Sequence, residues 1–267
     1  MRMERLAAQL YTVRAHTQTP ADLLASLKKI RGIGYRAVQV SGVGPIREED
    51  LLEMLEGEGL TCCVTHEPGE RILAEPERVA ERLRKLKCAF TAYPIPAGVR
   101  LDTPYPGRGL LETQADVERL AEGLDRSGEV LRRAGVTLTY HNHAVEFRRF
   151  DGRRTMLESI YALTRPENLQ AELDTYWVQA GGADPVAWCR RLKGRLPLLH
   201  LKDYAIGPDF RPAFAEVGYG NLDFPAIVEA AEDSSCQWFI VEQDVCPGDP
   251  FESLEKSYRW VSENLVK

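Results

Sequence analysis

Two imidazoles and two carboxylates stand at or near the carboxyl ends of four consecutive strand-like segments in the second half of the sequence. These residues are His141, Asp174, His200 and Glu242. Each follows the previous one at an interval of roughly one strand and one helix. Side chains at the carboxyl ends of parallel strands converge on one rim when the strands form a barrel. The types and spacing of these residues therefore predict a common site.

A divalent metal ion is the ligand that such a set favours. Mixed nitrogen and oxygen donors suit manganese, zinc, cobalt or iron better than calcium. We expect one ion per chain, with manganese or zinc ahead of cobalt, iron and magnesium. Taken singly, each of the four residues is better explained as a hydrogen-bonded polar group of a barrel interior, and it is their joint position that indicates a metal.

Further polar and aromatic residues lie near the ends of the other strand-like segments. Five of them could bind a polyol substrate: Gln9, Tyr11, His66, Tyr93 and Trp177. Glu146, five residues beyond His141, could serve as a catalytic acid or base. The alternative for each is an ordinary role, either packing in the barrel or a place in a solvated loop.

The alternation of apolar and polar side chains along the strand-like segments shows which side chains point into the barrel. In 136–141, Leu138 and Tyr140 share one face while Thr139 and His141 share the other. Because side chains alternate between the two faces of a strand, the apolar face belongs under helices and the polar face points inward. The same division places Glu172 and Asp174 inward on the next strand, followed by His200 with Lys202 and then Glu242.

Strand and helix patterns alternate eight times along the chain. The expected strands are residues 6–11, 35–41, 60–66, 89–95, 136–141, 169–174, 196–202 and 238–242. The expected helices are residues 21–31, 47–57, 75–87, 112–134, 155–163, 184–192, 223–232 and 250–265. Eight such units in 267 residues predict an α/β fold, a (β/α)8 TIM barrel that forms a single domain over residues 1–267.

An open doubly wound sheet is the alternative architecture. Its phosphate-binding fingerprint should follow a strand and open a helix. The nearest match here, Gly32-x-Gly34-x-x-Ala37, follows a helix and enters a strand. Two long connections, 94–111 and 203–222, follow strand ends and are interpreted either as lids over a site or as solvated loops.

Composition excludes several classes of protein. With 44% hydrophobic and 28% charged residues, the chain is not disordered, and a net charge of −6 opposes non-specific binding of nucleic acid. We find no apolar run of the roughly 18 residues that a membrane span needs, and expect neither a membrane role nor a secretory signal. The six scattered cysteines fit reduced thiols in a cytoplasmic protein. The sequence is compatible with either a monomer or a homo-oligomer.

Six segments in order along the chain resemble the xylose isomerase-like barrels, the superfamily of sugar isomerases and epimerases. They are AQLYTVR (8–14), YHNH (140–143), ELDTYW (172–177), LHLKD (199–203), VGYGN (217–221) and VEQD (241–244). In ketose epimerases of this superfamily a Glu–Asp–His–Glu set holds the metal. Asp174, His200 and Glu242 match its last three positions, whereas His141 stands where those enzymes have glutamate. The opening segment and the His-x-His pair are closer to the branch that contains inosose dehydratase and enzymes acting on keto-sugars or keto-glycosides.

The resemblance implies proton abstraction next to a carbonyl, with a metal-stabilised enediolate. It implies Glu242 as the base, His143 or Glu146 as its proton partner, and Lys202 as a group that holds developing negative charge. A metal-dependent isomerase or epimerase acting on a sugar or keto-sugar is the first expectation. An inosose or keto-sugar dehydratase is the alternative, ahead of a metal-dependent phosphodiesterase or endonuclease and a non-catalytic sugar-binding barrel.

Overall fold

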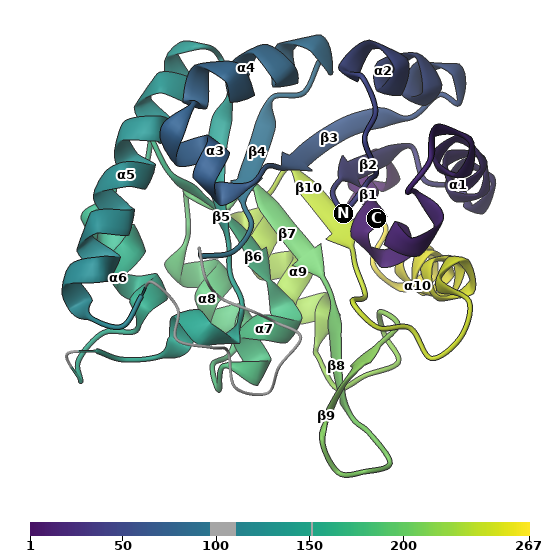
Figure 1. The fold of residues 1–267 in the computed structure, drawn as a ribbon. Coiled ribbons are helices and arrows are strands. Elements are labelled where there is room, and N and C mark those ends of the chain that lie inside the picture. Colours follow the sequence, from purple (N-terminus) through teal and green to yellow (C-terminus); the bar gives the residue numbers. More distant parts are fainter. Residues whose placement is uncertain (97–110, 151) are drawn as a thin grey trace.

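Eight short, largely apolar strands form the centre of the molecule (Figure 1). A computed structural model describes residues 1–96, 111–150 and 152–267. The strands are β1 (Leu6–Gln9), β2 (Ala37–Val40), β3 (Thr61–His66), β4 (Phe90–Tyr93), β5 (Thr137–His141), β6 (Gln170–Asp174), β7 (Leu198–Leu201) and β10 (Trp238–Val241). All neighbouring pairs are parallel, and β1 pairs with both β2 and β10, so the barrel is closed. The predicted (β/α)8 fold is confirmed.

The register of the strands aligns the residues that matter for the site. His141 on β5 pairs with Glu172 on β6. Asp174 on β6 pairs with His200 on β7, which pairs on its other side with Ile240 on β10. Three neighbouring strands therefore deliver polar side chains to one end of the barrel.

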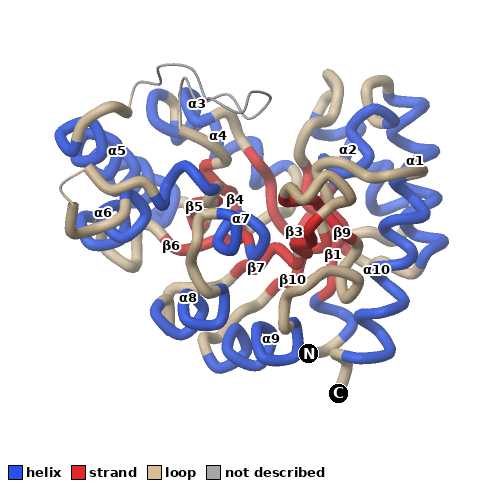
Figure 2. The backbone as a smooth tube through the Cα atoms, turned by 90° about the horizontal axis from the view of Figure 1, so that it is seen from below, coloured by secondary structure: helices blue, strands red, loops and turns tan. Residues whose placement is uncertain are grey.

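Helices enclose the strands as an outer ring, which is clearest in the view of Figure 2. They are α1 (Pro20–Ile33), α2 (Glu48–Gly57), α4 (Pro76–Lys85), α5 (Gln114–Arg133), α6 (Met156–Leu163), α8 (Pro185–Arg191), α9 (Phe224–Asp233) and α10 (Pro250–Asn264). Several begin with proline directly after a capping side chain, as at Thr19 before α1 and Asp184 before α8. A proline at the first position has no N–H that needs a partner, and the cap satisfies one of the free N–H groups of the first turn.

Apolar side chains fill two layers. The larger one lies between strands and helices and includes Leu138, Tyr140 and Leu199. A smaller cluster includes Leu198 and Ile240. By strand alternation, Leu198 shares its face with His200. The barrel interior is thus apolar below and polar at its mouth.

Additional short elements lie before β1 and after several strand ends. They are α3 (Gly69–Ala74), α7 (Thr175–Ala180), the antiparallel hairpin β8 (Asp203–Ile206) with β9 (Pro212–Ala215), and the 3-10 segments η1 (Met3–Arg5), η2 (Leu10–His16) and η3 (Ala144–Phe147). The expected strand 6–11 ends at Gln9 because η2 begins at Leu10. The connection 203–222 contains the hairpin, which projects from the barrel in Figure 1, whereas most of the connection 94–111 lies outside the described residues.

None of the described helices combines the length and the apolar character that crossing a membrane requires. All six cysteines, each within the described ranges, are free thiols, and only Cys246 is not buried.

Candidate metal centre and cavity

The four predicted ligands meet at the mouth of the barrel. One ligand atom from each of His141, Asp174, His200 and Glu242 lies within 4.8 Å of those of the other three. His141 and Asp174 are the last residues of β5 and β6, His200 lies in β7, and Glu242 directly follows β10. All four are buried.

The donor atoms of this cluster fit a divalent cation. Nδ1 of His200 lies 2.9 Å from Oε2 of Glu242 and 3.8 Å from Oδ2 of Asp174, and Nε2 of His141 lies 3.9 Å from that same Oδ2. Within the described part of the chain, the buried Oδ2 of Asp174 has no hydrogen-bond partner, while Oδ1 accepts the N–H of Trp177. Burial raises the pKa of Asp174 to about 7. Two imidazole nitrogens and two carboxylate oxygens around one point match the preference of manganese, zinc, cobalt and iron.

Lys202 brings a positive charge to the edge of the cluster. Its Nζ lies 2.7 Å from Asp244, 3.0 Å from Glu242 and 3.4 Å from Asp174, and the side chain is 1% exposed. Burial opposes its charge, but these carboxylates raise the pKa of Lys202 above its usual value. Asp244, which ends the VEQD segment, was not among the predicted site residues, although alternation places it on the same face as Glu242.

A cavity of about 550 Å³ opens above the cluster. Of the predicted residues, seven line it: Tyr11, His66, His141, His143, Trp177, Lys202 and Glu242. Apolar side chains that the sequence did not single out complete the wall, among them Phe214 from β9 and Val245. A polar floor with an apolar wall is typical of small-molecule sites.

His143 and Glu146 take different places. His143 lines the cavity, its Nδ1 has no hydrogen-bond partner among the residues that the structure describes, and burial lowers its pKa well below the usual value. Glu146 is fully buried, accepts the backbone N–H of His143 at 2.7 Å and the hydroxyl of Tyr140 at 3.0 Å, and is not among the described residues that line the cavity. Burial raises the pKa of Glu146 to about 7. Its contacts hold the segment that carries His143.

Gln9 and Tyr93 also lie away from the cavity wall formed by the described residues. Gln9 is fully buried and accepts the N–H of Tyr11 through its side chain. The ring of Tyr93 stacks on Tyr140, 5.7 Å between centroids, within the layer between strands and helices.

Glu172 is a buried member of the polar cluster that the sequence did not assign to the site. Its carboxylate contacts Nε2 of His66 at 2.6 Å and Nδ1 of His141 at 3.1 Å, and accepts the side-chain N–H of Gln39 at 2.8 Å. Alternation predicts its inward direction, but Gln39 lies 133 positions away in the sequence.

The hairpin β8–β9 contributes an aromatic wall and is held at its base by Asp203. Phe214 stacks on Tyr176, 4.1 Å between centroids. The Asp203 carboxylate accepts the backbone N–H groups of four residues: Tyr204, Gly218, Gly220 and Leu222. A Cβ on Gly220 would lie 2.4 Å from Oδ1 of Asp203, so only glycine allows this approach.

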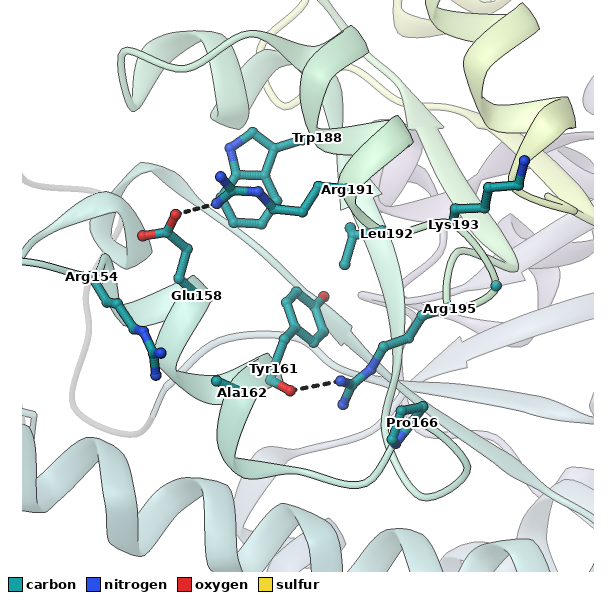
Figure 3. Close-up of a pocket in the computed structure, with 11 residues that line it drawn as sticks. Arg154, Glu158, Tyr161, Ala162, Pro166, Trp188, Arg191, Leu192, Lys193 and Arg195 are labelled. Atoms are coloured by element: carbon teal, nitrogen blue, oxygen red, sulfur yellow. Dashed lines mark hydrogen bonds and ion pairs between the residues drawn. The ribbon is translucent and has the colours of Figure 1, made fainter.

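A second hollow of about 420 Å³ lies on the outside of the barrel, beside α6 and α8 (Figure 3). Two of the arginines that line it, Arg191 and Arg195, stabilise the fold. Arg195 donates to the carbonyl oxygens of Leu169 and Tyr161, and Arg191 forms an ion pair with Glu158. None of the predicted site residues lines this hollow.

Known proteins share this fold and part of the sequence. An inosose dehydratase of Lacticaseibacillus casei is 28% identical over an alignment that covers 57% of this chain and 56% of that protein, so the chain spans little more than half the length of this curated relative. A sugar phosphate isomerase/epimerase of Parabacteroides distasonis superposes with a TM-score of 0.80 at 23% identity, over 100% of this chain and 96% of the other. An L-ribulose 3-epimerase superposes with a TM-score of 0.72 at 17% identity, over 99% and 95%.

The model of the xylose isomerase-like TIM barrel family matches residues 27–264. That match spans seven of the eight barrel strands and includes all four residues of the metal cluster. The chain therefore belongs to the xylose isomerase-like TIM barrel family.

Proposed function

We propose that the protein is a metal-dependent enzyme that removes a proton next to the carbonyl of a keto-sugar or keto-polyol. The observation that carries the proposal is the convergence of two imidazoles and two carboxylates, within 4.8 Å of one another, beneath a cavity of about 550 Å³ that His141 and Glu242 line. The curated relative named inosose dehydratase supports a substrate of this kind.

A single divalent ion would be held by His141, Asp174, His200 and Glu242, with manganese or zinc favoured. When bound, such an ion acts as a Lewis acid on a carbonyl and an adjacent hydroxyl and stabilises negative charge that develops there. The residues of the chain supply the remaining chemistry.

Glu242 is the proposed base. It lines the cavity, and although burial alone would raise the pKa of its carboxyl, Lys202 and His200 hold that pKa well below the usual value. The group is therefore ionised and able to accept a proton. The ammonium of Lys202, also on the cavity wall, donates hydrogen bonds to substrate oxygen as negative charge develops.

Return of the abstracted proton by Glu242 to the neighbouring carbon gives an isomerase, and delivery of a proton from solvent to the other face of the same carbon gives an epimerase. His143 would be the proton partner in the isomerisation: burial keeps its imidazole neutral and its Nδ1 has no hydrogen-bond partner among the described residues, so it can take the proton of the substrate hydroxyl and pass it to the former carbonyl oxygen. Trp177 and Tyr11 would orient the substrate from the cavity wall. Glu146 acts behind His143 by fixing its backbone.

Dehydration is the second candidate outcome. His141 occupies the position where the ketose epimerases carry a glutamate, so one face of the substrate lacks the second carboxylate of a two-glutamate exchange. The relative of this chain named inosose dehydratase points the same way. In this reaction the ammonium of Lys202 would protonate the departing hydroxyl, and the proton that Glu242 takes from the substrate would restore the ammonium across their 3.0 Å contact.

One experiment separates these outcomes. Protein loaded with Mn²⁺ or Zn²⁺ is incubated in D₂O with a panel of keto-inositols and ketohexoses, and proton NMR is recorded together with ultraviolet absorbance. Deuterium next to the carbonyl without a new chromophore supports the isomerase or epimerase, and an enedione-type chromophore supports the dehydratase. If neither appears with any compound, while the Asp174→Asn control behaves like the wild type, the enzymatic proposal is wrong.

The proposal also includes a small-molecule substrate and a reducing, cytoplasmic setting, which the six free thiols support. Elemental analysis tests the competing phosphodiesterase, because that chemistry uses several metal ions whereas the proposed site holds one.

A further inference from the structure

We infer that Glu172 is a positioning residue that sets, together with Gln39, which nitrogen of each metal-site imidazole faces the ion. The inference rests on the proposed metal site and concerns residues below it. It assigns a role to a carboxylate that would neither bind the ion nor contact the substrate.

Glu172 is the centre of a buried network. Its side chain is fully buried, and four side-chain nitrogen atoms lie within 3.4 Å of its oxygens. Oε2 lies 2.6 Å from Nε2 of His66 and 3.1 Å from Nδ1 of His141, and Oε1 accepts a hydrogen bond of 2.8 Å from Nε2 of Gln39. Oε1 also lies 3.4 Å from Nε2 of His200.

These contacts determine which ring nitrogen of His141 carries the hydrogen. An ionised carboxylate can only accept hydrogen bonds, so an imidazole nitrogen that faces it carries the hydrogen. Nδ1 of His141 lies 3.1 Å from Oε2 of Glu172 but has no hydrogen-bond partner among the described residues; the negative charge beside it favours the hydrogen on this nitrogen. The lone pair of His141 is then on Nε2, the nitrogen that lies 3.9 Å from Oδ2 of Asp174.

Gln39 transmits the same constraint to His200. Because the amide N–H of Gln39 donates to Glu172, its oxygen is turned toward His200 and lies 2.7 Å from Nε2. An amide oxygen is an acceptor, so Nε2 of His200 carries the hydrogen. In this structure Nδ1 lies 2.9 Å from the carboxylate Oε2 of Glu242 and donates to it; because Nε2 is held by Gln39, Nδ1 is the nitrogen that would lose its hydrogen to bind the ion.

The two imidazoles thus present opposite nitrogens to one point. His141 offers Nε2 and His200 offers Nδ1, and both assignments trace back to Glu172. Carboxylates in this position orient metal-binding histidines and raise their basicity, and their loss typically lowers metal affinity about 10- to 100-fold.

A second ion bound by the lower cluster is the competing interpretation. His66, His141, Glu172 and His200 also offer ligand atoms within 4.8 Å of one another. Two contacts oppose it: the Gln39 amide occupies Oε1 of Glu172, and its oxygen occupies Nε2 of His200. The stoichiometry of binding decides between the two.

Calorimetric titration of the metal-free chain with Zn²⁺ is the first test. We expect one ion per wild-type chain and about 10- to 100-fold weaker binding to Glu172→Gln. Gln39→Leu should weaken binding less, because it removes support from His200 alone. Thr65→Val is the matched control: it removes a buried hydrogen bond to Thr91 outside the network and should leave affinity unchanged.

Long-range proton–nitrogen NMR of the zinc-loaded wild type is the second test, and it does not require that any variant folds. With only five histidines in the chain, the spectra should show His141 bound through Nε2 and His200 through Nδ1. The opposite pattern at either ring overturns the inference.

The remaining outcomes separate this inference from the proposed function. Equal affinity of the wild type and Glu172→Gln removes the positioning role and leaves the metal site intact. Two ions per wild-type chain, one of them lost in Glu172→Gln, make Glu172 a ligand instead. A wild-type chain that binds no ion removes the proposed function itself.

Discussion

The ammonium nitrogen of Lys202 lies 3.0 Å from Oε2 of Glu242, and both side chains are buried at the mouth of the barrel. The same nitrogen lies 2.7 Å from Asp244 and 3.4 Å from Asp174. One lysine thus faces three carboxylates in a space from which water is largely excluded. It is an integral part of the charge balance of the site.

Replacement of this lysine should therefore cost stability as well as activity. Removing one partner of a buried ion pair leaves charge uncompensated and typically costs about 3–5 kcal/mol. We expect Lys202→Met to lose an amount in this range in urea denaturation with EDTA, and less with saturating Zn²⁺. The control is Lys256→Met, at a more exposed pair with Glu216, which should lose no more than about 1 kcal/mol. A Lys202→Met chain as stable as the wild type in EDTA would contradict this charge balance.

Metal removal should lower the melting temperature of the wild type. A ligand that binds only the folded state at 100 times its dissociation constant adds about 2.7 kcal/mol. Asp174→Asn retains an oxygen that can cap the N–H of Trp177 but removes the carboxylate charge at Oδ2, the atom that lies 3.4 Å from Nζ of Lys202. Calorimetry with EDTA or with Mn²⁺ should show a shift for the wild type and little or none for Asp174→Asn. Equal shifts in the two proteins would place the ion elsewhere.

Glu146 should make the wild type less stable as pH rises. Because burial raises the pKa of its carboxyl to about 7, the folded state holds a proton between pH 4.5 and 7 that the unfolded state has released. This contribution to stability falls as pH rises through that window, by up to about 3 kcal/mol, and is constant above it. Glu146→Gln should therefore gain stability relative to the wild type as pH rises, as measured by urea denaturation.

Glu158 provides the control for that measurement. Glu158 forms a capping box with Thr155 at the start of α6. Burial alone would raise its pKa, but the N–H and hydroxyl of Thr155 and the guanidinium of Arg191 outweigh burial and lower the pKa. Its stabilising contribution is already complete above pH 4.5. The difference between Glu158→Gln and the wild type should be constant from pH 4.5 to 7, and a slope like that of Glu146→Gln would show that the method does not isolate Glu146.

The aromatic wall of the cavity should affect substrate binding more than stability. Phe214 lines the cavity and stacks on Tyr176, whereas Phe210, at the tip of the same hairpin, is 89% exposed. Aromatic contacts are worth about 0.5–1.5 kcal/mol, so Phe214→Ala should raise KM about 2- to 10-fold. Phe210→Ala should leave KM unchanged. If the two substitutions have the same effect on KM, the wall takes no part in binding.

Alternation along the strands predicts direction, and this accounts for much of the site. The contrast between the apolar face of β5, with Leu138 and Tyr140, and its polar face, with Thr139 and His141, shows which face points inward. On β4 the run Phe-Thr-Ala-Tyr offers no such contrast, and Tyr93 lies in the layer between strands and helices rather than on the cavity wall. Gln9 shows the second limit, because alternation does not fix depth: its side chain is fully buried.

Contacts between side chains on distant strands of the barrel cannot be predicted from the sequence alone. Glu172 is predicted to point inward, but its contacts with Gln39 and His66 depend on how the strands are staggered once the barrel closes. Similarly, Asp203 lies in a segment that resembles the family, yet its bonds to Gly218 and Gly220 require the hairpin between them, which the sequence suggests only as a long connection.

The clamp formed by Asp203 has an evolutionary consequence. By binding backbone N–H groups on both sides of the hairpin, this one carboxylate fixes the ends of an insertion whose tip is exposed to solvent at Phe210. Descendants of this chain can exchange residues 205–216 for a shorter or longer loop, and so recruit new compounds, while the ion-binding rim below is inherited intact.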